Sequence, residues 1–156
     1  MAKNHTLRQW RTEDSIELYG IRNWGAGYFN VNEKGDAVIC PDGPEGPHIP
    51  IMEIIAGLQE RGYDMPVLLR VENILDSRIS SLHKAFRKAI SDLGYRGQYR
   101  GVFPIKVNQQ QQVVEKIAQF GAQYHHGLEV GSKAELIAAV AMMRDTEACL
   151  ICNGYK

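Results

Sequence analysis

The chain has 156 residues, of which 44% are hydrophobic, and its 18 Lys and Arg balance 18 Asp and Glu. That length suits one ordinary domain, and a net charge of zero provides no overall field to attract nucleic acid or a membrane surface. Residues 1–6 lack the apolar core of a signal peptide, and no apolar run approaches the ~20 residues of a membrane helix, so we expect a cytoplasmic protein without nucleic-acid or membrane partners.

The first 48 residues indicate a β-rich segment. Two strand-like runs, residues 27–32 and 37–40, flank the turn residues 33–36, and this pattern predicts an antiparallel hairpin. The Pro- and Gly-rich run 41–47 then interrupts regular structure. We predict that residues 1–48 form an N-terminal β-hairpin segment, part of an appended β-domain.

From residue 49 onward the pattern alternates between helices and strands. Apolar residues at helical spacing predict four helices, and short apolar runs predict four strands. The helices are residues 50–61, a long helix with apolar residues from Leu75 to Leu93, one after Asn108 and one after Ser132; the strands are 67–71, 98–107, 127–130 and 148–152. This order, with short connections, predicts a parallel sheet with right-handed crossovers.

Two of the helix starts carry capping signals. Asn108 and Ser132 are the expected N-caps, each with Gln111 or Glu135 three residues later in the capping-box position. For the last helix we expect a buried face made of four apolar residues, Leu136, Ile137, Val140 and Met143.

The chain ends shortly after the strand at 148–152, without a helix to cover it. A parallel strand needs neighbours on its open edge, and a complete eight-stranded barrel needs at least roughly 200 residues. We therefore expect the α/β class, with residues 49–156 forming an incomplete (β/α) barrel that belongs to a larger protein.

The three cysteines show neither a metal nor a redox motif. Cys149 and Cys152 have C-x-x-C spacing, but they lie in the apolar run 148–152. A thioredoxin-like motif begins a helix, and a zinc site needs a second pair of ligands. We expect reduced structural thiols.

Residues 103–109, Phe-Pro-Ile-Lys-Val-Asn-Gln, place Lys106 at the end of an apolar strand just before a helix. Small molecules bind at that edge of the sheet in α/β folds. Apolar neighbours disfavour the ammonium form of a lysine, and a neutral amine attacks a carbonyl. The pattern favours a Schiff-base lysine, although most strand-end lysines are simply solvated. Pro104 predicts a local irregularity in this strand, because proline removes a ladder donor.

Four segments of the chain resemble the family of biosynthetic arginine decarboxylases, pyridoxal-phosphate enzymes of the alanine-racemase-like (fold type III) group. Residues 19–32 are similar to the family's Trp-Gly-x-Gly-Tyr-Phe opening, residues 67–75 to its first barrel strand, and residues 103–109 to its cofactor-lysine motif. The last segment, residues 127–136 with 151–156, is similar to the next two strand-end motifs.

The resemblance implies a function and assigns residues to it. Lys106 would hold pyridoxal 5'-phosphate, and Glu129 would lie in the cofactor pocket. The reaction would convert L-arginine to agmatine and carbon dioxide in polyamine (spermidine) biosynthesis, in an enzyme that forms a homo-oligomer at full length and is associated with Mg²⁺. The loops that usually grip phosphate follow strands seven and eight of a barrel, so we expect the 156 residues alone to be inactive.

The positions of the other polar residues predict lesser roles for them. Lys133 and Lys156 are expected to be solvated, Glu135 to cap its helix, and Asn153 and Tyr155 are weaker candidates for the pocket wall. His125 and His126 precede the strand at 127–130, at the end of a barrel that serves stability. His5, His48 and His83 show no metal-ligand spacing.

Three alternatives stay open. The enzyme could be a related decarboxylase that acts on ornithine, lysine or diaminopimelate. It could be a non-catalytic pyridoxal-phosphate carrier, although such proteins lack an appended β-domain. It could also be a short product that acts only as an interaction module.

Overall fold

The computed structural model of the protein describes residues 8–154. The chain divides into two compact units, Met1–Val71 and Glu72–Lys156. The helix expected at residues 50–61 belongs to the first of these units, whereas the division of the sequence into domains 1–48 and 49–156 stays a prediction. Each unit has its own sheet, antiparallel in the first and parallel in the second.

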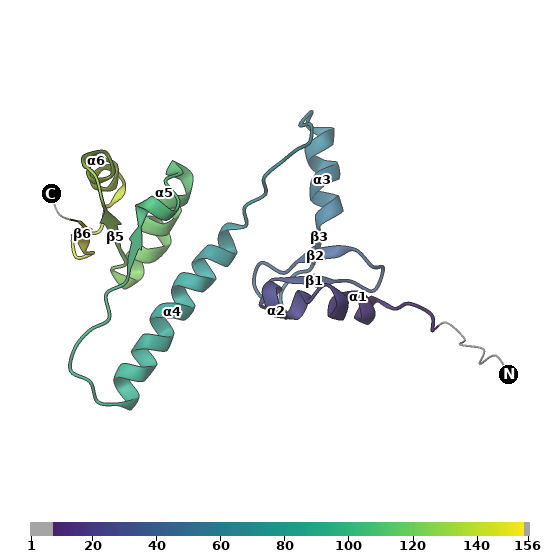
Figure 1. The fold of residues 1–156 in the computed structure, drawn as a ribbon, viewed down its shortest axis with the longest axis horizontal. Helices are drawn as coiled ribbons and strands as arrows, with labels where there is room; N and C mark the ends of the chain where they lie inside the picture. Colours follow the sequence, from purple (N-terminus) through teal and green to yellow (C-terminus); the bar gives the residue numbers. More distant parts are fainter. Residues whose placement is uncertain (1–7, 155–156) are drawn as a thin grey trace. The chain divides into compact units, whose positions relative to one another are not determined.

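The first unit is a small antiparallel sheet with short helices. Its elements are α1 (Thr12–Leu18), α2 (Ile21–Gly25), β1 (Phe29–Val31), β2 (Ala37–Ile39), β3 (Ile49–Pro50) and α3 (Ile51–Glu60) (Figure 1). The predicted hairpin is confirmed as β1 and β2, which pair Phe29 with Ile39. Asn32 closes the turn, because its Oδ1 accepts hydrogen bonds from the backbone N–H groups of Lys34 and Asp36. The sequence reading missed α1, α2 and β3.

The predicted strand at residues 67–71 is wrong. This segment has no regular structure, and Leu68 is 72% exposed. Strand propensity describes how well a residue suits a pleated and half-buried surface. Within residues 8–154, no strand pairs with this segment to provide such a surface.

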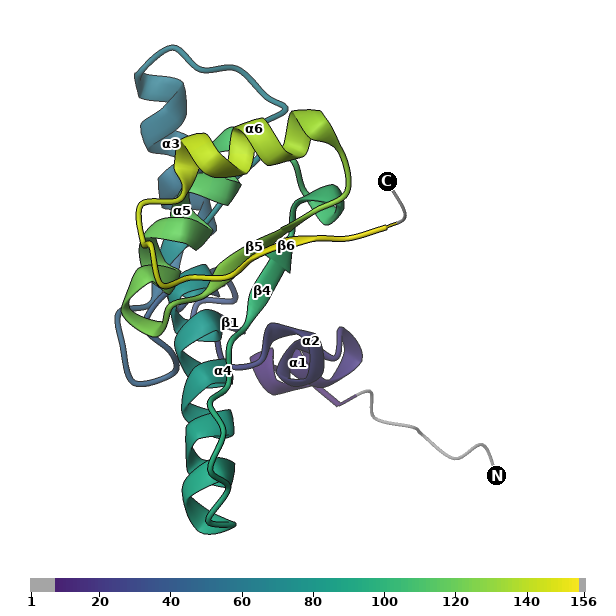
Figure 2. The same ribbon diagram turned by 90° about the vertical axis from the view of Figure 1, so that its left-hand side faces the viewer.

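The second unit is built on three parallel strands. Its elements are α4 (Glu72–Asp92), β4 (Val102–Pro104), the 3₁₀ turn η1 (Ile105–Val107), α5 (Gln111–Gly121), the 3₁₀ turn η2 (Ala122–Tyr124), β5 (Gly127–Val130), α6 (Lys133–Met142) and β6 (Leu150–Cys152). The strands lie side by side in the order β4-β5-β6, with α5 and α6 packed against β5 (Figure 2). This arrangement confirms the α/β class and is consistent with the first part of a (β/α) barrel that follows a β-rich segment.

The core of the second unit lies between the sheet and its helices. Leu128 on β5, Val114 on α5 and Ala139 on α6 are all 0% exposed. Ile79 of α4 and Ile105 of η1 belong to the same buried cluster. Because burying one large aliphatic side chain contributes about 1.5–3 kcal/mol, this cluster fixes where β4, β5 and the turn after β4 lie.

The buried face predicted for α6 is correct for two of its four residues. Leu136 of α6 and Met143, which follows the helix, pack against the core together with Ala139, whereas Ile137 and Val140 are 72% and 62% exposed. The three core residues lie three or four positions apart and form one stripe, and the other two lie on its flank.

The N-cap of α5 is Gln110, not Asn108. The Asn108 side chain instead accepts a hydrogen bond from Gln110 N at 3.1 Å, inside the loop. No helix within residues 8–154 is both long enough and apolar enough to cross a membrane.

Candidate functional site

Lys106 lies in the turn that follows β4, not on a strand. The strand expected at residues 98–107 is shorter in the structure and ends at Pro104, and Lys106 is the middle residue of η1. Ile105, 3% exposed, anchors the turn in the core, and Asn108 N donates to Ile105 O at 3.1 Å to close it. The irregularity predicted from Pro104 therefore occurs directly beside Lys106.

The Lys106 side chain is 62% exposed. Apolar neighbours therefore do not desolvate the amine within the described part of the chain, contrary to the expectation from the sequence. The exposure has a different consequence, because the amine is accessible to a small molecule at the carboxyl edge of a parallel sheet. In open α/β sheets this edge is where ligands bind.

Glu129 approaches Lys106 from the neighbouring strand. It is the third residue of β5 and lies opposite Pro104 in the register. Leu128 and Val130 point into the core, so the alternation of the strand sends Glu129 to the other face. Its Oε1 lies 3.9 Å from Lys106 Nζ. An ion pair with so exposed a lysine contributes about 0–1 kcal/mol to the stability of the fold. Its main consequence is that the Glu129 carboxylate lies beside the Lys106 amine.

Asn153 reaches the same carboxylate from β6. Its Nδ2 donates to Glu129 Oε1 at 2.7 Å, and its backbone N donates to Val130 O at 2.8 Å. From the sequence, Asn153 was only a weaker candidate for the pocket wall. Its position directly after a parallel strand, at the same edge of the sheet as Lys106, is the feature of the sequence that could have indicated this contact.

Glu135 connects two loops at this edge. Ser132 Oγ accepts a hydrogen bond from Glu135 N at 3.2 Å, which confirms the predicted cap of α6. The Glu135 carboxylate extends further: Oε2 accepts from Gly131 N at 2.5 Å and Oε1 accepts from Gln109 Nε2 at 3.0 Å. It therefore ties the loop after β5 to the loop after η1, which sequence reasoning did not predict. Lys133 is exposed, as expected.

A histidine pair lies at the opposite end of the sheet, before β5. His83 Nε2 and His126 Nδ1 share a hydrogen bond of 2.9 Å, and both residues are buried. Burial lowers the pKa of both histidines, and the nearby Arg87 guanidinium lowers the pKa of His83 further. The His83 ring also stacks on Tyr124, with 4.7 Å between centroids.

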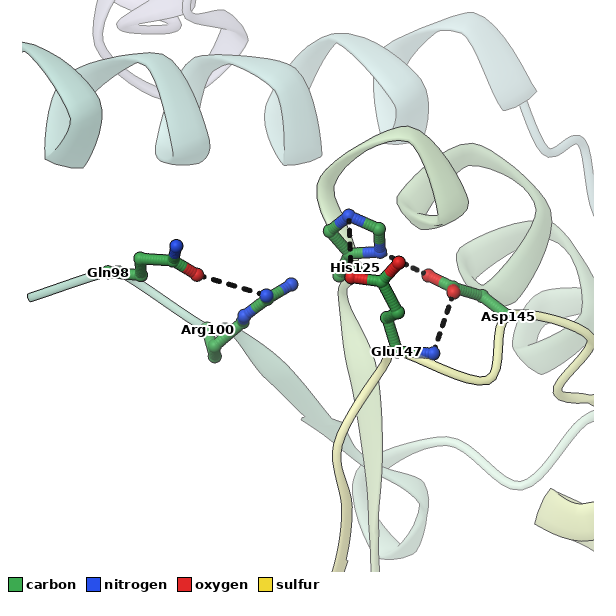
Figure 3. A network of polar contacts seen from close by, with 5 residues as sticks. All are labelled: Gln98, Arg100, His125, Asp145 and Glu147. Carbon is green, nitrogen blue, oxygen red and sulfur yellow. Dashed lines mark hydrogen bonds and ion pairs between the residues drawn. The ribbon is translucent and has the colours of Figure 1, made fainter.

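His125 forms a separate polar network at this end (Figure 3). Its Nδ1 lies 2.9 Å from Asp145 Oδ2 and its Nε2 lies 3.7 Å from Glu147 Oε2. A hydrogen bond from the backbone of Glu147, followed by one from His125, lowers the pKa of Asp145. The network joins the residues before β5 to those before β6. His125 and His126 therefore lie before β5, as predicted, and their structural role stays a prediction.

Metal ligands do not gather anywhere in the described residues: among 8–154, no group of three or more His, Cys, Asp and Glu could hold an ion. The association with Mg²⁺ that the family resemblance implies stays an expectation. Cys40, Cys149 and Cys152 are free thiols. Tyr155 and Lys156 lie outside the described residues, as does His5.

Comparisons with known proteins agree with one another. The family described as the pyridoxal binding domain of pyridoxal-dependent decarboxylases matches residues 76–156. The biosynthetic arginine decarboxylase of Prochlorococcus marinus is 46% identical over 149 residues, which cover 96% of this chain and 23% of that protein. The protein of the same name from Gloeobacter violaceus is 44% identical over 150 residues, with the same coverage.

A solved structure extends the likeness to the fold. The crystal structure of the biosynthetic arginine decarboxylase from Campylobacter jejuni matches with a TM-score of 0.80 and 35% identity, over 88% of this chain and 22% of that one. The chain thus spans less than a quarter of the length of these relatives.

Proposed function

The chain belongs to the family of pyridoxal-dependent decarboxylases, and we propose that the protein to which it belongs converts L-arginine to agmatine and carbon dioxide. The substrate rests on the names of the relatives, which are biosynthetic arginine decarboxylases at 46% and 44% identity. The family match confirms the pyridoxal-dependent class that the motifs predicted. The chain covers only part of these relatives, so the reaction is proposed for the protein that contains these residues.

One observation carries the proposal: Lys106 presents an accessible amine at the carboxyl edge of the parallel sheet, 3.9 Å from the Glu129 carboxylate. Pyridoxal phosphate, when bound, supplies an aldehyde that condenses with a lysine amine with loss of water, and a ring that accepts the electron pair left when carbon dioxide departs. The residues present fit such a group, because they provide an exposed primary amine and an adjacent acid.

Each of these residues has a distinct role in the proposal. Lys106 would hold the cofactor covalently. Glu129 places a carboxylate oxygen 3.9 Å from the amine, which is longer than a hydrogen bond. Such contacts commonly tighten once a ligand is bound, and the oxygen would then accept or return a proton at the amine. The hydrogen bonds of Glu135 hold the loop after η1 against the loop after β5. The Lys106 amine and the Glu129 carboxylate therefore stay at the same edge of the sheet.

We also propose that the full-length protein is a cytoplasmic homo-oligomer, with L-arginine as its small-molecule partner. This rests on the family resemblance and on the biosynthetic role that the relatives' names state. Light scattering of the purified full-length protein tests the oligomeric state, and a monomer at micromolar concentration would contradict it.

A substrate assay tests the proposed function. The longest protein encoded by the frame that includes these residues is supplied with pyridoxal phosphate, and agmatine is measured. The panel contains arginine, ornithine, lysine and diaminopimelate. We expect turnover of arginine that Lys106→Ala abolishes and that Lys84→Ala, a change of an exposed lysine on α4, leaves unchanged. Turnover of ornithine or diaminopimelate instead would reassign the substrate, and cofactor binding without decarboxylation would favour a carrier.

A further inference from the structure

The Asn153 side chain is held in place by its own backbone. It follows β6 directly, and its N–H donates to Val130 O at 2.8 Å, which continues the pairing of β6 with β5. The side-chain amide therefore starts from a fixed position beside β5. From there Nδ2 donates to Glu129 Oε1 at 2.7 Å, a good hydrogen-bond distance for an amide and a carboxylate.

The acceptor atom is the same oxygen that lies closest to the candidate cofactor lysine. Glu129 Oε1 is 2.7 Å from Asn153 Nδ2 and 3.9 Å from Lys106 Nζ. A glutamate side chain has three rotatable torsions and is mobile unless a contact fixes it. The Glu129 side chain is 22% exposed, and the Asn153 amide is the side-chain donor that orients it.

The amide also suits the acid as a hydrogen-bond partner. The N–H groups of a carboxamide donate and a carboxylate oxygen accepts. Asn153 therefore holds Glu129 Oε1 in the position from which it faces the amine. An aspartate at this position would instead place two carboxylates together, which repel each other unless they share a proton.

We propose that Asn153 is a positioning residue for the cofactor reaction: it holds the Glu129 carboxylate beside Lys106, and it acts on the lysine only through that carboxylate. This inference rests on the proposed function of Lys106. It predicts that removal of the amide lowers the reactivity of Lys106 toward the cofactor aldehyde, because the proton acceptor is then no longer fixed near the amine.

The experiment measures the labelling of individual lysines. The longest protein encoded by the frame that includes these residues is incubated with pyridoxal phosphate and reduced with borohydride. The label on Lys106 is then divided by the label on Lys34, an exposed lysine of the first unit. Asn153→Leu removes the donor without adding charge, and Asn153→Asp keeps the size. Asn23→Leu, an exposed asparagine of α2, is the matched control. Circular dichroism and urea midpoints establish that each variant is folded.

We expect the labelling ratio to fall about threefold in Asn153→Leu, which is less than the effect of losing an ideally placed acid or base. The decisive comparison uses Glu129→Gln as background, since groups that act as one unit are not additive. In that background, Asn153→Leu should lower the ratio no further. Asn153→Asp should also lower the ratio at neutral pH, because a second carboxylate beside Glu129 repels it.

Two results would overturn the inference. An unchanged ratio in folded Asn153→Leu would show that the amide does not position the acid. Additive losses in the double variant would show that Asn153 acts on the fold and not through Glu129. Both differ from a failure of the proposed function, in which Lys106 of the parent chain is labelled no more than Lys34.

Discussion

Replacing Leu128 by alanine should strongly destabilise the second unit. Leu128 is 0% exposed in β5, the middle strand, and lies opposite Phe103 and Leu150 in the register. The change removes three buried carbons at about 0.8 kcal/mol each, or about 2.4 kcal/mol. The cavity left behind raises the expected loss to about 3–4 kcal/mol. Because Glu129 follows Leu128 directly, the same packing also holds the acid of the candidate site.

Urea unfolding followed by far-UV circular dichroism measures this loss. Tryptophan fluorescence does not report on the second unit, because Trp10 and Trp24 both precede residue 72. Leu93→Ala is the matched control: it makes the same chemical change at a side chain that is 82% exposed, and should cost less than about 0.5 kcal/mol. Equal losses in Leu128→Ala and Leu93→Ala would refute the buried position of β5.

Three further predictions concern a cap, a histidine pair and the thiols. Ser132→Ala removes the oxygen that accepts from the backbone at the start of α6, and should cost about 1 kcal/mol in urea unfolding; a stability equal to that of the parent would contradict the cap. Burial lowers the pKa of His83 and His126, so the unfolded chain binds more protons. The protein should therefore have its full stability at a pH above the ordinary histidine pKa of 6.5, and its unfolding free energy should fall as the pH drops toward the lower pKa of the folded state. A urea midpoint that is the same at about pH 8 and about pH 5 would contradict this. Burial raises the pKa of the Cys40 thiol, whereas Cys152 is exposed. Peptide mapping after reaction with iodoacetamide should therefore show that Cys152 is modified at least about tenfold faster than Cys40. Faster modification of Cys40 would be inconsistent with its burial.

The features that could be predicted from the sequence are those fixed by residues near one another in the chain. The cap of α6 depends on Ser132 and Glu135, three positions apart, and the hairpin of β1 and β2 depends on one short turn. The alternation of helices and strands from Glu72 onward follows in the same way from local spacing. These patterns were sufficient to predict the α/β class.

The features that could not be predicted depend on partners far away in the chain. A run such as 67–71 becomes a strand only when another strand pairs with it, and its sequence does not show whether one does. The extended run that contains Lys106 changes to a turn at Pro104, because Ile105 is drawn into a core built from other elements. The bond between Asn153 and Glu129 joins residues 24 positions apart, and only the register of β5 and β6 brings them together.

The identity of the lysine that binds the cofactor is the most direct test of the central claim. The protein is loaded with pyridoxal phosphate, reduced with borohydride, digested, and mapped by mass spectrometry. The account predicts that the label lies on the peptide containing Lys106, and that Lys106→Arg removes it. Label on Lys133 or Lys156 with Lys106 unmodified would contradict the account.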